Sequence, residues 1–339
     1  MTSRELVYAA LENRSPERAP RDLWTLPWAE NHYPQELKKI REDFPSDFGG
    51  VDVRYEKYAE TKGDPYQKGV YVDPWGCEFE NIFEGIIGEV KHPLIPTEDE
   101  EWDNVGKIHI PTESLTFDID QVNAECAKSD KFISGGCCPR PFEQLQFIRG
   151  TENLYIDLLD PPPKMLQFMD LMHEFYCELM EKWAKTDVDC LNFMDDWGSQ
   201  RSLLISPALW KKYFKPKYKD YIDIAHSHGK KIFMHSDGYT LDIYPELIEL
   251  GLDAFNSQIF CIGPENLEQF KGKITFWGEI DRQNLLPYGT EEEIRQAVRR
   301  VYDHLWDRGG CIAQMEFGAG AKPENVYAAF DEWEKLTRQ

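Results

Sequence analysis

The chain has 339 residues, of which 41% are hydrophobic and 29% are charged, a composition typical of a globular protein. Its 61 acidic and 38 basic residues give a net charge of −23, which argues against nucleic acid or an anionic membrane as a partner. There is no run of 18 apolar residues, no apolar signal segment near the N-terminus, and no Cys-x-x-Cys pair among the eight cysteines. We therefore expect a reduced, cytoplasmic protein without a membrane span or a cysteine-rich zinc module.

The first half of the chain offers two strand candidates, RDLWTL (21–26) and FISGGCC (132–138), each followed by helix-like sequence. Between them, GVYVDPWGCEFENI (69–82) has the alternation and the central turn residues of a hairpin-like insertion.

From about residue 185 onward, short apolar strands alternate with helical stretches. A helix is expected from the Ser206-Pro207 pair to Gly229, and another from a threonine cap at Thr290 to the glycines at 309–310. The expected strands of this half are DCLNFMDDWGSQ (189–200), KKIFMHSDG (230–238), DAFNSQIF (253–260), KITFWGEIDRQ (273–283) and GCIAQMEFGAG (310–320).

Five such units, with those of the first half, predict parallel βαβ units in an α/β protein. We expect a single (β/α)8 TIM barrel domain over residues 1–339, with an N-terminal extension and the hairpin-like insertion. A doubly wound open sheet is the alternative, but no glycine-rich phosphate turn follows the first strand.

Polar side chains follow all five late strands. In a barrel the carboxyl ends of the strands form the active-site rim, and buried charges there need partners or a metal. The residues at these ends are Asp195 and Asp196, His235 and Asp237, Asn256 and Gln258, Glu279 and Asp281, and Gln314 and Glu316.

His235 and Asp237 are two residues apart at the end of one strand, so their side chains share a side. With Glu316, which ends a later strand, they form a plausible three-ligand zinc set with one coordination position left for substrate. The alternative is a hydrogen-bonded His–Asp pair without metal.

Neighbouring strand residues point to opposite sides, so only one of Asp195 and Asp196 can face the barrel axis. Trp24, Trp197 and Trp277 lie near strand ends, where they could line an aromatic-substrate pocket, stack on a sugar, or pack in the core. A glycosidase would use paired carboxylates, whereas these strand ends are rich in histidine and amides.

Several segments together resemble the uroporphyrinogen decarboxylase superfamily, and the opening MTSRELVYAALENRSPERAP is similar to its first helix. This resemblance covers nearly the whole chain and implies a (β/α)8 barrel. The segments are DDWGSQRSLLISPALW, KKIFMHSDG, GLDAFNSQ, FWGEIDRQNLLPYGT and GGCIAQMEFGAGAKPENV.

The superfamily contains two chemistries. Its decarboxylases grip an anionic tetrapyrrole with arginines of an R-Q-A-G-R motif, but the corresponding region here reads PRDLWTLPWAENHYP. Its corrinoid-linked methyltransferases bind zinc through H-x-C and a later cysteine, positions that match His235, Asp237 and Glu316 here. DPWGCEFEN and GIIGEVKHP resemble members linked to O-demethylation of methoxylated aromatics.

The resemblance thus implies a zinc-dependent methyltransferase that moves a methyl group from a methoxylated, aromatic small molecule to the cobalt of cobalamin on a separate, transient corrinoid protein. Alternatives are a decarboxylase of a tetrapyrrole or smaller acid, using Arg201 and Arg282, and a non-enzymatic binding module. The implied site residues are Asp196 and Glu279 for substrate orientation or proton supply, and Trp24, Trp197, Trp277 and Gln258 for substrate contact.

Overall fold

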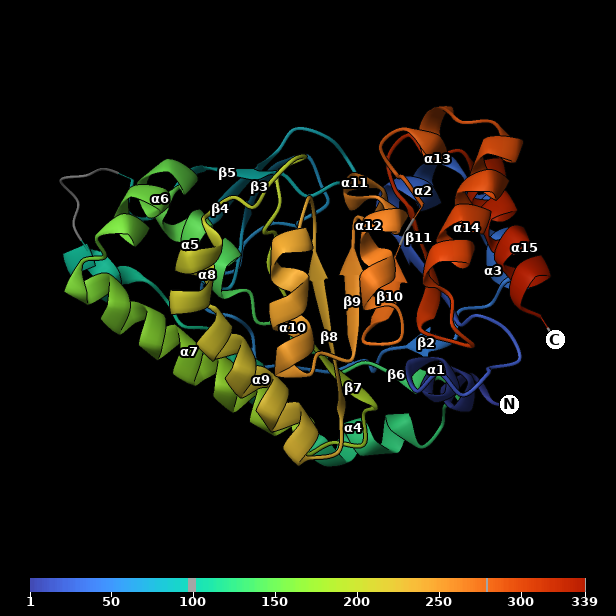
Figure 1. Ribbon diagram of the computed structural model, residues 1–339. Coiled ribbons are helices and arrows are strands. Elements are labelled where there is room, and N and C mark those ends of the chain that lie inside the picture. The colour runs from blue at the N-terminus through green and yellow to red at the C-terminus, as the bar shows by residue number, and fades with distance from the viewer. Residues whose placement is uncertain (97–101, 279, 339) are drawn as a thin grey trace.

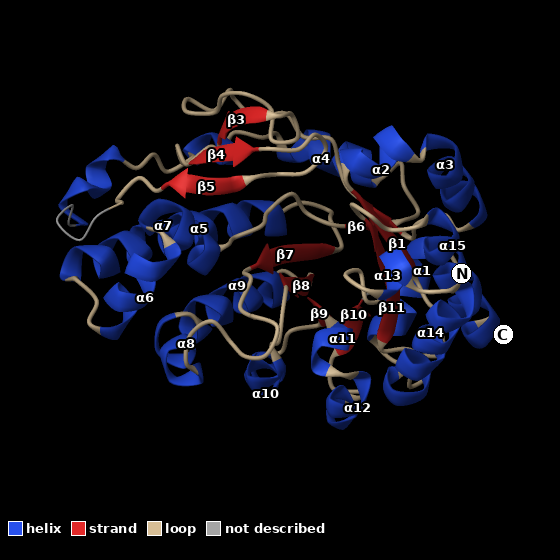
Figure 2. Ribbon diagram, turned by 90° about the horizontal axis from the view of Figure 1, so that it is seen from above, coloured by secondary structure: helices blue, strands red, loops and turns tan. Residues whose placement is uncertain are grey.

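A six-stranded parallel sheet forms the centre of the computed structural model, which describes residues 1–96, 102–278 and 280–338. Its strand order is β1-β11-β10-β9-β8-β7, and seen from above the strands follow a curve with helices on the outer side (Figure 2). The strands are β1 (Arg21–Thr25), β7 (Cys190–Met194), β8 (Lys231–Ser236), β9 (Ala254–Ser257), β10 (Thr275–Gly278) and β11 (Cys311–Phe317).

Two further parallel strands, β2 (Phe48–Gly49) and β6 (Phe132–Ile133), form a separate pair. The amide of Asp189 donates to the carbonyl of Ile133, next to β7, and the amide of Asp47 donates to the carbonyl of Arg21 in β1. The fold is therefore α/β, as predicted, and the described residues form eight parallel strands, six in one sheet and two in another.

The helices cover the outer face of the parallel sheet, and both chain termini lie on the side of α1 and α15 (Figure 1). Their bounds are α1 Ser3–Leu11, α2 Pro27–His32, α3 Pro34–Asp43, η1 Trp102–Lys107, η2 Thr112–Leu115, α4 Ile119–Cys126, α5 Pro141–Arg149, α6 Thr151–Leu159, α7 Pro163–Ala184, α8 Pro207–Tyr213, α9 Lys215–Ser227, η3 Leu241–Ile243, α10 Tyr244–Leu250, α11 Ile259–Ile262, α12 Pro264–Leu267, η4 Glu268–Phe270, α13 Leu285–Tyr288, α14 Glu291–Leu305 and α15 Pro323–Thr337.

The expected helix from Ser206 to Gly229 is in fact two helices, α8 and α9. The Ser206 hydroxyl accepts from the amide of Leu209 and caps α8, as the sequence suggested. The break follows from Pro216, which has no amide hydrogen and whose ring clashes with the carbonyl four residues earlier.

The predicted hairpin is confirmed: β3 (Gly69–Val72) pairs antiparallel with β4 (Glu78–Asn81). A third strand, β5 (Glu89–His92), extends it. This small sheet lies at the same end of the molecule as the arrowheads of β8 and β9 (Figure 1). No helix in the described part of the chain is long and apolar enough to cross a membrane.

Two glycines hold together the loops that follow β7 and β8. Gly238 has a φ of +79°, and a Cβ atom there would lie 2.0 Å from the carbonyl oxygen of Gly198. A side chain at Gly238 would force the two loops apart. These loops carry Asp196 and Asp237, the carboxylates that follow β7 and β8.

We predict that Gly238→Ala lowers the free energy of unfolding by about 3 kcal/mol, through backbone strain combined with overpacking. Gly229→Ala is the matched control, because Gly229 also has a positive φ, +68°, but no atom within 4 Å of its added Cβ. Its expected cost is about 1 kcal/mol. Chemical denaturation of both variants measures the difference, and equal costs would rule out the close loop approach.

Candidate metal centre and aromatic cavity

The imidazole of His235 is oriented by an amide on the next strand. Parallel pairing of β8 with β9 places His235 opposite Asn256, and Nδ1 of His235 lies 2.5 Å from Oδ1 of Asn256. The amide nitrogen of Asn256 donates to the carbonyl of Trp277 and to Oε1 of Gln314, so its oxygen must face the histidine. Nδ1 therefore carries the hydrogen, and Nε2 is free to accept a proton or a metal ion.

Two carboxylates face this nitrogen. Oδ1 of Asp196 and Oδ1 of Asp237 each lie 3.6 Å from Nε2 of His235, and the three ligand atoms lie within 4.8 Å of one another. A lone pair and two carboxylates repel one another unless a cation lies between them. The distance of 3.6 Å is too long for a good hydrogen bond. It is close to the spacing of about 3.3 Å between ligands of a tetrahedral zinc with bonds of about 2.0–2.1 Å.

Backbone amides position the Asp196 carboxylate and the loop that carries Asp237. The amide of Asp237 donates to Oδ1 of Asp196, at 2.9 Å, and the amide of Gly238 donates to Oε1 of Gln258, at 3.1 Å. Gln258, predicted to contact substrate, thus holds the loop that carries Asp237.

Glu316, the third predicted ligand, is not part of this cluster. Its carboxylate is ion-paired with the guanidinium of Arg282, which also binds Oδ2 of Asp237. The structure thus brings His235 and Asp237 together, adds Asp196, and connects Glu316 to them through Arg282. Glu279, a predicted catalytic residue, lies outside the described residues.

A cavity of about 740 Å³ opens beside the cluster, with walls from β1, β2, β8 and β10. Two of the predicted tryptophans, Trp24 and Trp277, line it, and their ring centroids are 5.1 Å apart. The ring of Trp24 lies 5.6 Å from that of His235, so the aromatic wall adjoins the proposed ligands. Phe48 and Phe233 add to this apolar surface.

Asp22 fixes both tryptophans. Each indole nitrogen donates to Oδ2 of Asp22, at 2.9 Å. This carboxyl is buried, and burial raises its pKa from 3.8 to about 6 despite the two hydrogen bonds. No pattern at the strand end indicated Asp22, because it lies within β1 and not after it.

Asp195 and Trp197 lie away from the cavity. Asp195 is fully buried and accepts from the amides of Phe142 and Glu143 and from the hydroxyl of Tyr218. Thus Asp195 caps α5 while Asp196 faces the cluster, as the opposite directions of neighbouring strand residues predicted. Trp197 is fully buried, and its indole nitrogen donates to the same Tyr218 hydroxyl.

Sequence reasoning missed Glu143 in the first turn of α5. Its pKa is raised to about 7, chiefly by burial, with contributions from the charges of Asp196 and Asp237, while Arg140 and His235 act in the opposite direction. Its carboxyl lies 3.4 Å from Arg140. Only the Pro141 helix start marks this segment in the sequence, and that signal carries no chemical information.

We predict that Asp22→Asn changes how stability depends on pH. The raised pKa means that the native state holds the Asp22 proton more tightly than the unfolded state. The contribution of Asp22 to stability therefore falls as pH rises from about 4 through about 6, by about 3 kcal/mol in total. Asn does not titrate, so the variant lacks this pH-dependent loss. Its free energy of unfolding, minus that of the native chain, should rise by about 3 kcal/mol between pH 4 and pH 8.

Urea denaturation at a series of pH values measures this difference. Asp242→Asn, at an exposed position, controls for the loss of one negative charge. If the two proteins differed in their free energy of unfolding by the same amount at every pH, the raised pKa of Asp22 would be contradicted.

The chain is similar in fold to solved structures, among them one that it matches over nearly its whole length. This structure is a methyltransferase from Methanosarcina mazei, with a TM-score of 0.67, 12% identity, and 99% of each chain covered. Structures with lower TM-scores are a B12-independent methionine synthase from Shewanella sp. W3-18-1 (TM-score 0.43, 12% identity, 65% of this chain and 66% of that chain) and an endo-beta-1,4-xylanase from Gloeophyllum trabeum (TM-score 0.44, 10% identity, 96% of this chain and 98% of that chain).

No curated protein sequence matches the chain. The model of the uroporphyrinogen decarboxylase (URO-D) family, in contrast, matches residues 76–336, which is more than half of the sequence and includes β7 to β11. The chain belongs to the uroporphyrinogen decarboxylase family.

Proposed function

We propose that this protein transfers a methyl group from a methoxylated aromatic molecule to the cobalt of a corrinoid carried by a separate protein, with a zinc ion held by His235, Asp196 and Asp237. The observation that carries the proposal is the convergence of the free Nε2 of His235 with two carboxylates at 3.6 Å. When bound, zinc would act as a Lewis acid on the ether oxygen, and the corrinoid would be the methyl acceptor.

The cavity supports an aromatic substrate. Trp24 and Trp277 offer apolar surface beside the cluster, and Asp22 keeps their rings in place. None of the described residues that line this cavity is a lysine or an arginine. A tetrapyrrole with many carboxylates would need such partners, so the lining favours an uncharged ring over the substrate for which the family is named.

Individual residues would have distinct roles. Asn256 orients the histidine ring, and Arg282 neutralises charge at Asp237 and Glu316. Glu143, which is partly buried and feels the charges of Asp196 and Asp237, would be the proton donor to the leaving oxygen, because its pKa is raised to about 7. Glu279 remains a prediction for proton supply, whereas Trp197, fully buried away from the cavity, is given no role in substrate contact.

We also infer that the two parallel sheets close into one (β/α)8 barrel. The backbone hydrogen bonds from Asp189 to Ile133 and from Asp47 to Arg21 support this closure, as does the match with the Methanosarcina mazei fold. In such a barrel the cluster and the cavity lie at the carboxyl ends of the strands, where barrel enzymes carry their chemistry.

Metal content of the purified variants distinguishes two ligand sets. We expect His235→Ala and Asp196→Asn each to bind one zinc fewer per chain than the native protein, because each loses a ligand of a three-ligand site. Glu316→Gln should keep that zinc, since Glu316 binds Arg282 in the structure. Loss of the zinc in Glu316→Gln and its retention in Asp196→Asn would instead support the set His235, Asp237 and Glu316.

Methyl transfer can be followed directly with free cob(I)alamin as the acceptor and 2-methoxyphenol as the donor. We expect the native protein to form methylcobalamin and His235→Ala to be slower by about 100-fold or more, because metal polarisation contributes several kcal/mol. His226→Ala is the control, since His226 binds Asp253 at a different site and its loss should not change the rate. Failure to methylate cobalamin from a panel of methoxyarenes, together with carbon dioxide release from a carboxylated substrate, would favour the decarboxylase alternative.

A further inference from the structure

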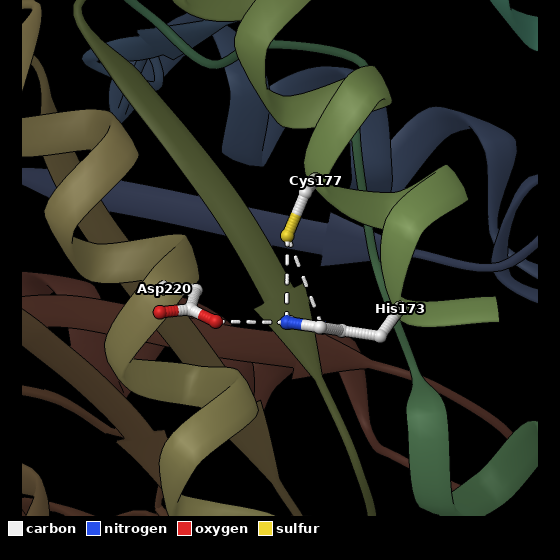
Figure 3. A group of neighbouring side chains, drawn as sticks. All are labelled: His173, Cys177 and Asp220. Carbon is white, nitrogen blue, oxygen red and sulfur yellow. Dashed lines mark hydrogen bonds and ion pairs between the residues drawn. The ribbon is translucent and has the colours of Figure 1, made fainter. Parts of the chain in front are cut away.

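A second group of metal-binding side chains lies on the outer helices, away from the cavity. His173 and Cys177 are four residues apart on α7, so both face the same side of that helix, and Asp220 approaches them from α9 (Figure 3). The side chains converge at the edge of the buried face of α7, which packs Met172, Tyr176 and other apolar residues inward.

The distances suit a zinc-type ion. Nε2 of His173 lies 2.9 Å from Oδ2 of Asp220 and 3.6 Å from Sγ of Cys177. Bond lengths of about 2.0–2.1 Å to nitrogen or oxygen and about 2.3 Å to sulfur place tetrahedral ligands about 3.3 and 3.6 Å apart. The sulfur spacing already matches, and the carboxylate needs to move by only a few tenths of an ångström.

The histidine is held by its other ring nitrogen. The hydroxyl of Tyr221, a fully buried residue of α9, lies 3.2 Å from Nδ1 of His173. When Nδ1 donates to this oxygen, the lone pair of Nε2 faces Asp220. Such a partner on the far nitrogen is a regular feature of histidines that bind metals.

The charges also balance. When the metal displaces the Cys177 proton, the thiolate and the carboxylate together neutralise a divalent ion, so the complex is neutral overall beside Lys217, whose ammonium binds Asp170 and the carbonyl of Met169. The side chain of Asp220 is 56% exposed, whereas that of His173 is 16% exposed. An ion can therefore enter from solvent on the Asp220 side, and water can supply the fourth ligand.

We propose that His173, Cys177 and Asp220 form a second metal site, selective for zinc or a similar borderline-soft divalent ion, which ties α7 to α9. Sulfur and imidazole ligands favour such ions over magnesium and calcium. Asp220 lies two residues from Tyr218 on α9, and the Tyr218 hydroxyl donates to Asp195, the neighbour of Asp196. A metal ion that links α7 to α9 would therefore support the helix behind the proposed active site. This site is independent of the proposed methyl transfer.

Cobalt(II) titration of the full-length protein tests the proposal, because only a cobalt–thiolate bond gives an intense near-ultraviolet charge-transfer band. The cluster of His235, Asp196 and Asp237 contains no sulfur and stays silent in this measurement. We expect the band in the native protein and in His235→Ala, saturating at one cobalt per chain, and its loss in Cys177→Ser. Cys261→Ser is the matched control, since Cys261 is also partly exposed but lies on α11, and it should keep the band.

The Asp220→Asn variant distinguishes a metal site with several ligands from cobalt bound to the Cys177 thiol alone. It should keep the band but weaken cobalt binding by at least tenfold, because the carboxylate supplies both a ligand and a charge. Circular dichroism and the thermal midpoint of each variant establish that it is folded. Absence of the band in the native protein, its survival in Cys177→Ser, or unchanged affinity in Asp220→Asn would each overturn the proposal.

Discussion

The hydrogen bond between His235 and Asn256 determines what the strand-end cluster can do. It exists because parallel register places the two residues opposite each other on β8 and β9. The Asn256 amide nitrogen is already engaged by Trp277 and Gln314, so it presents its oxygen and fixes the imidazole tautomer. Without this constraint Nε2 could carry the hydrogen and bind the carboxylates as an ordinary donor. With it, Nε2 directs a lone pair at the two carboxylates, where it can bind a proton or share a metal ion with them.

The cavity and the metal-binding cluster share a structural element, the Trp24 side chain. Trp24 contacts the ring of His235 on one side and is bound to Asp22 on the other, so a single buried carboxyl connects the apolar wall to the polar centre. An ionised Asp22 at this buried position lowers the stability of the protein at neutral pH. The same carboxylate accepts the hydrogen bonds that keep two indole rings in a fixed position. The combination of rigid aromatic surface and adjacent ligands suits a flat, uncharged substrate with one polar atom directed at the centre.

The sequence predicted the α/β class, the late strands, the hairpin and the position of His235 at a strand end, because each depends on local periodicity and on the rule that parallel strands end at one edge. It did not predict that Glu316 binds Arg282, since this ion pair depends on side-chain reach across a loop. Asp22, Glu143 and the helix pair around Cys177 were also missed. Their roles come from tertiary contacts between segments far apart in sequence, which leave no spacing pattern. Pro216 marks the break between α8 and α9, although the helical pattern on either side of it is continuous.

Anomalous diffraction at the zinc absorption edge, from crystals grown with zinc, tests the central claim most directly because it locates the ion and identifies its ligands. We predict a peak among Nε2 of His235 and the carboxylates of Asp196 and Asp237, with only nitrogen and oxygen around it. An empty position there, with the imidazole turned away from Asn256 or hydrogen-bonded through Nε2 to a carboxylate, would contradict it.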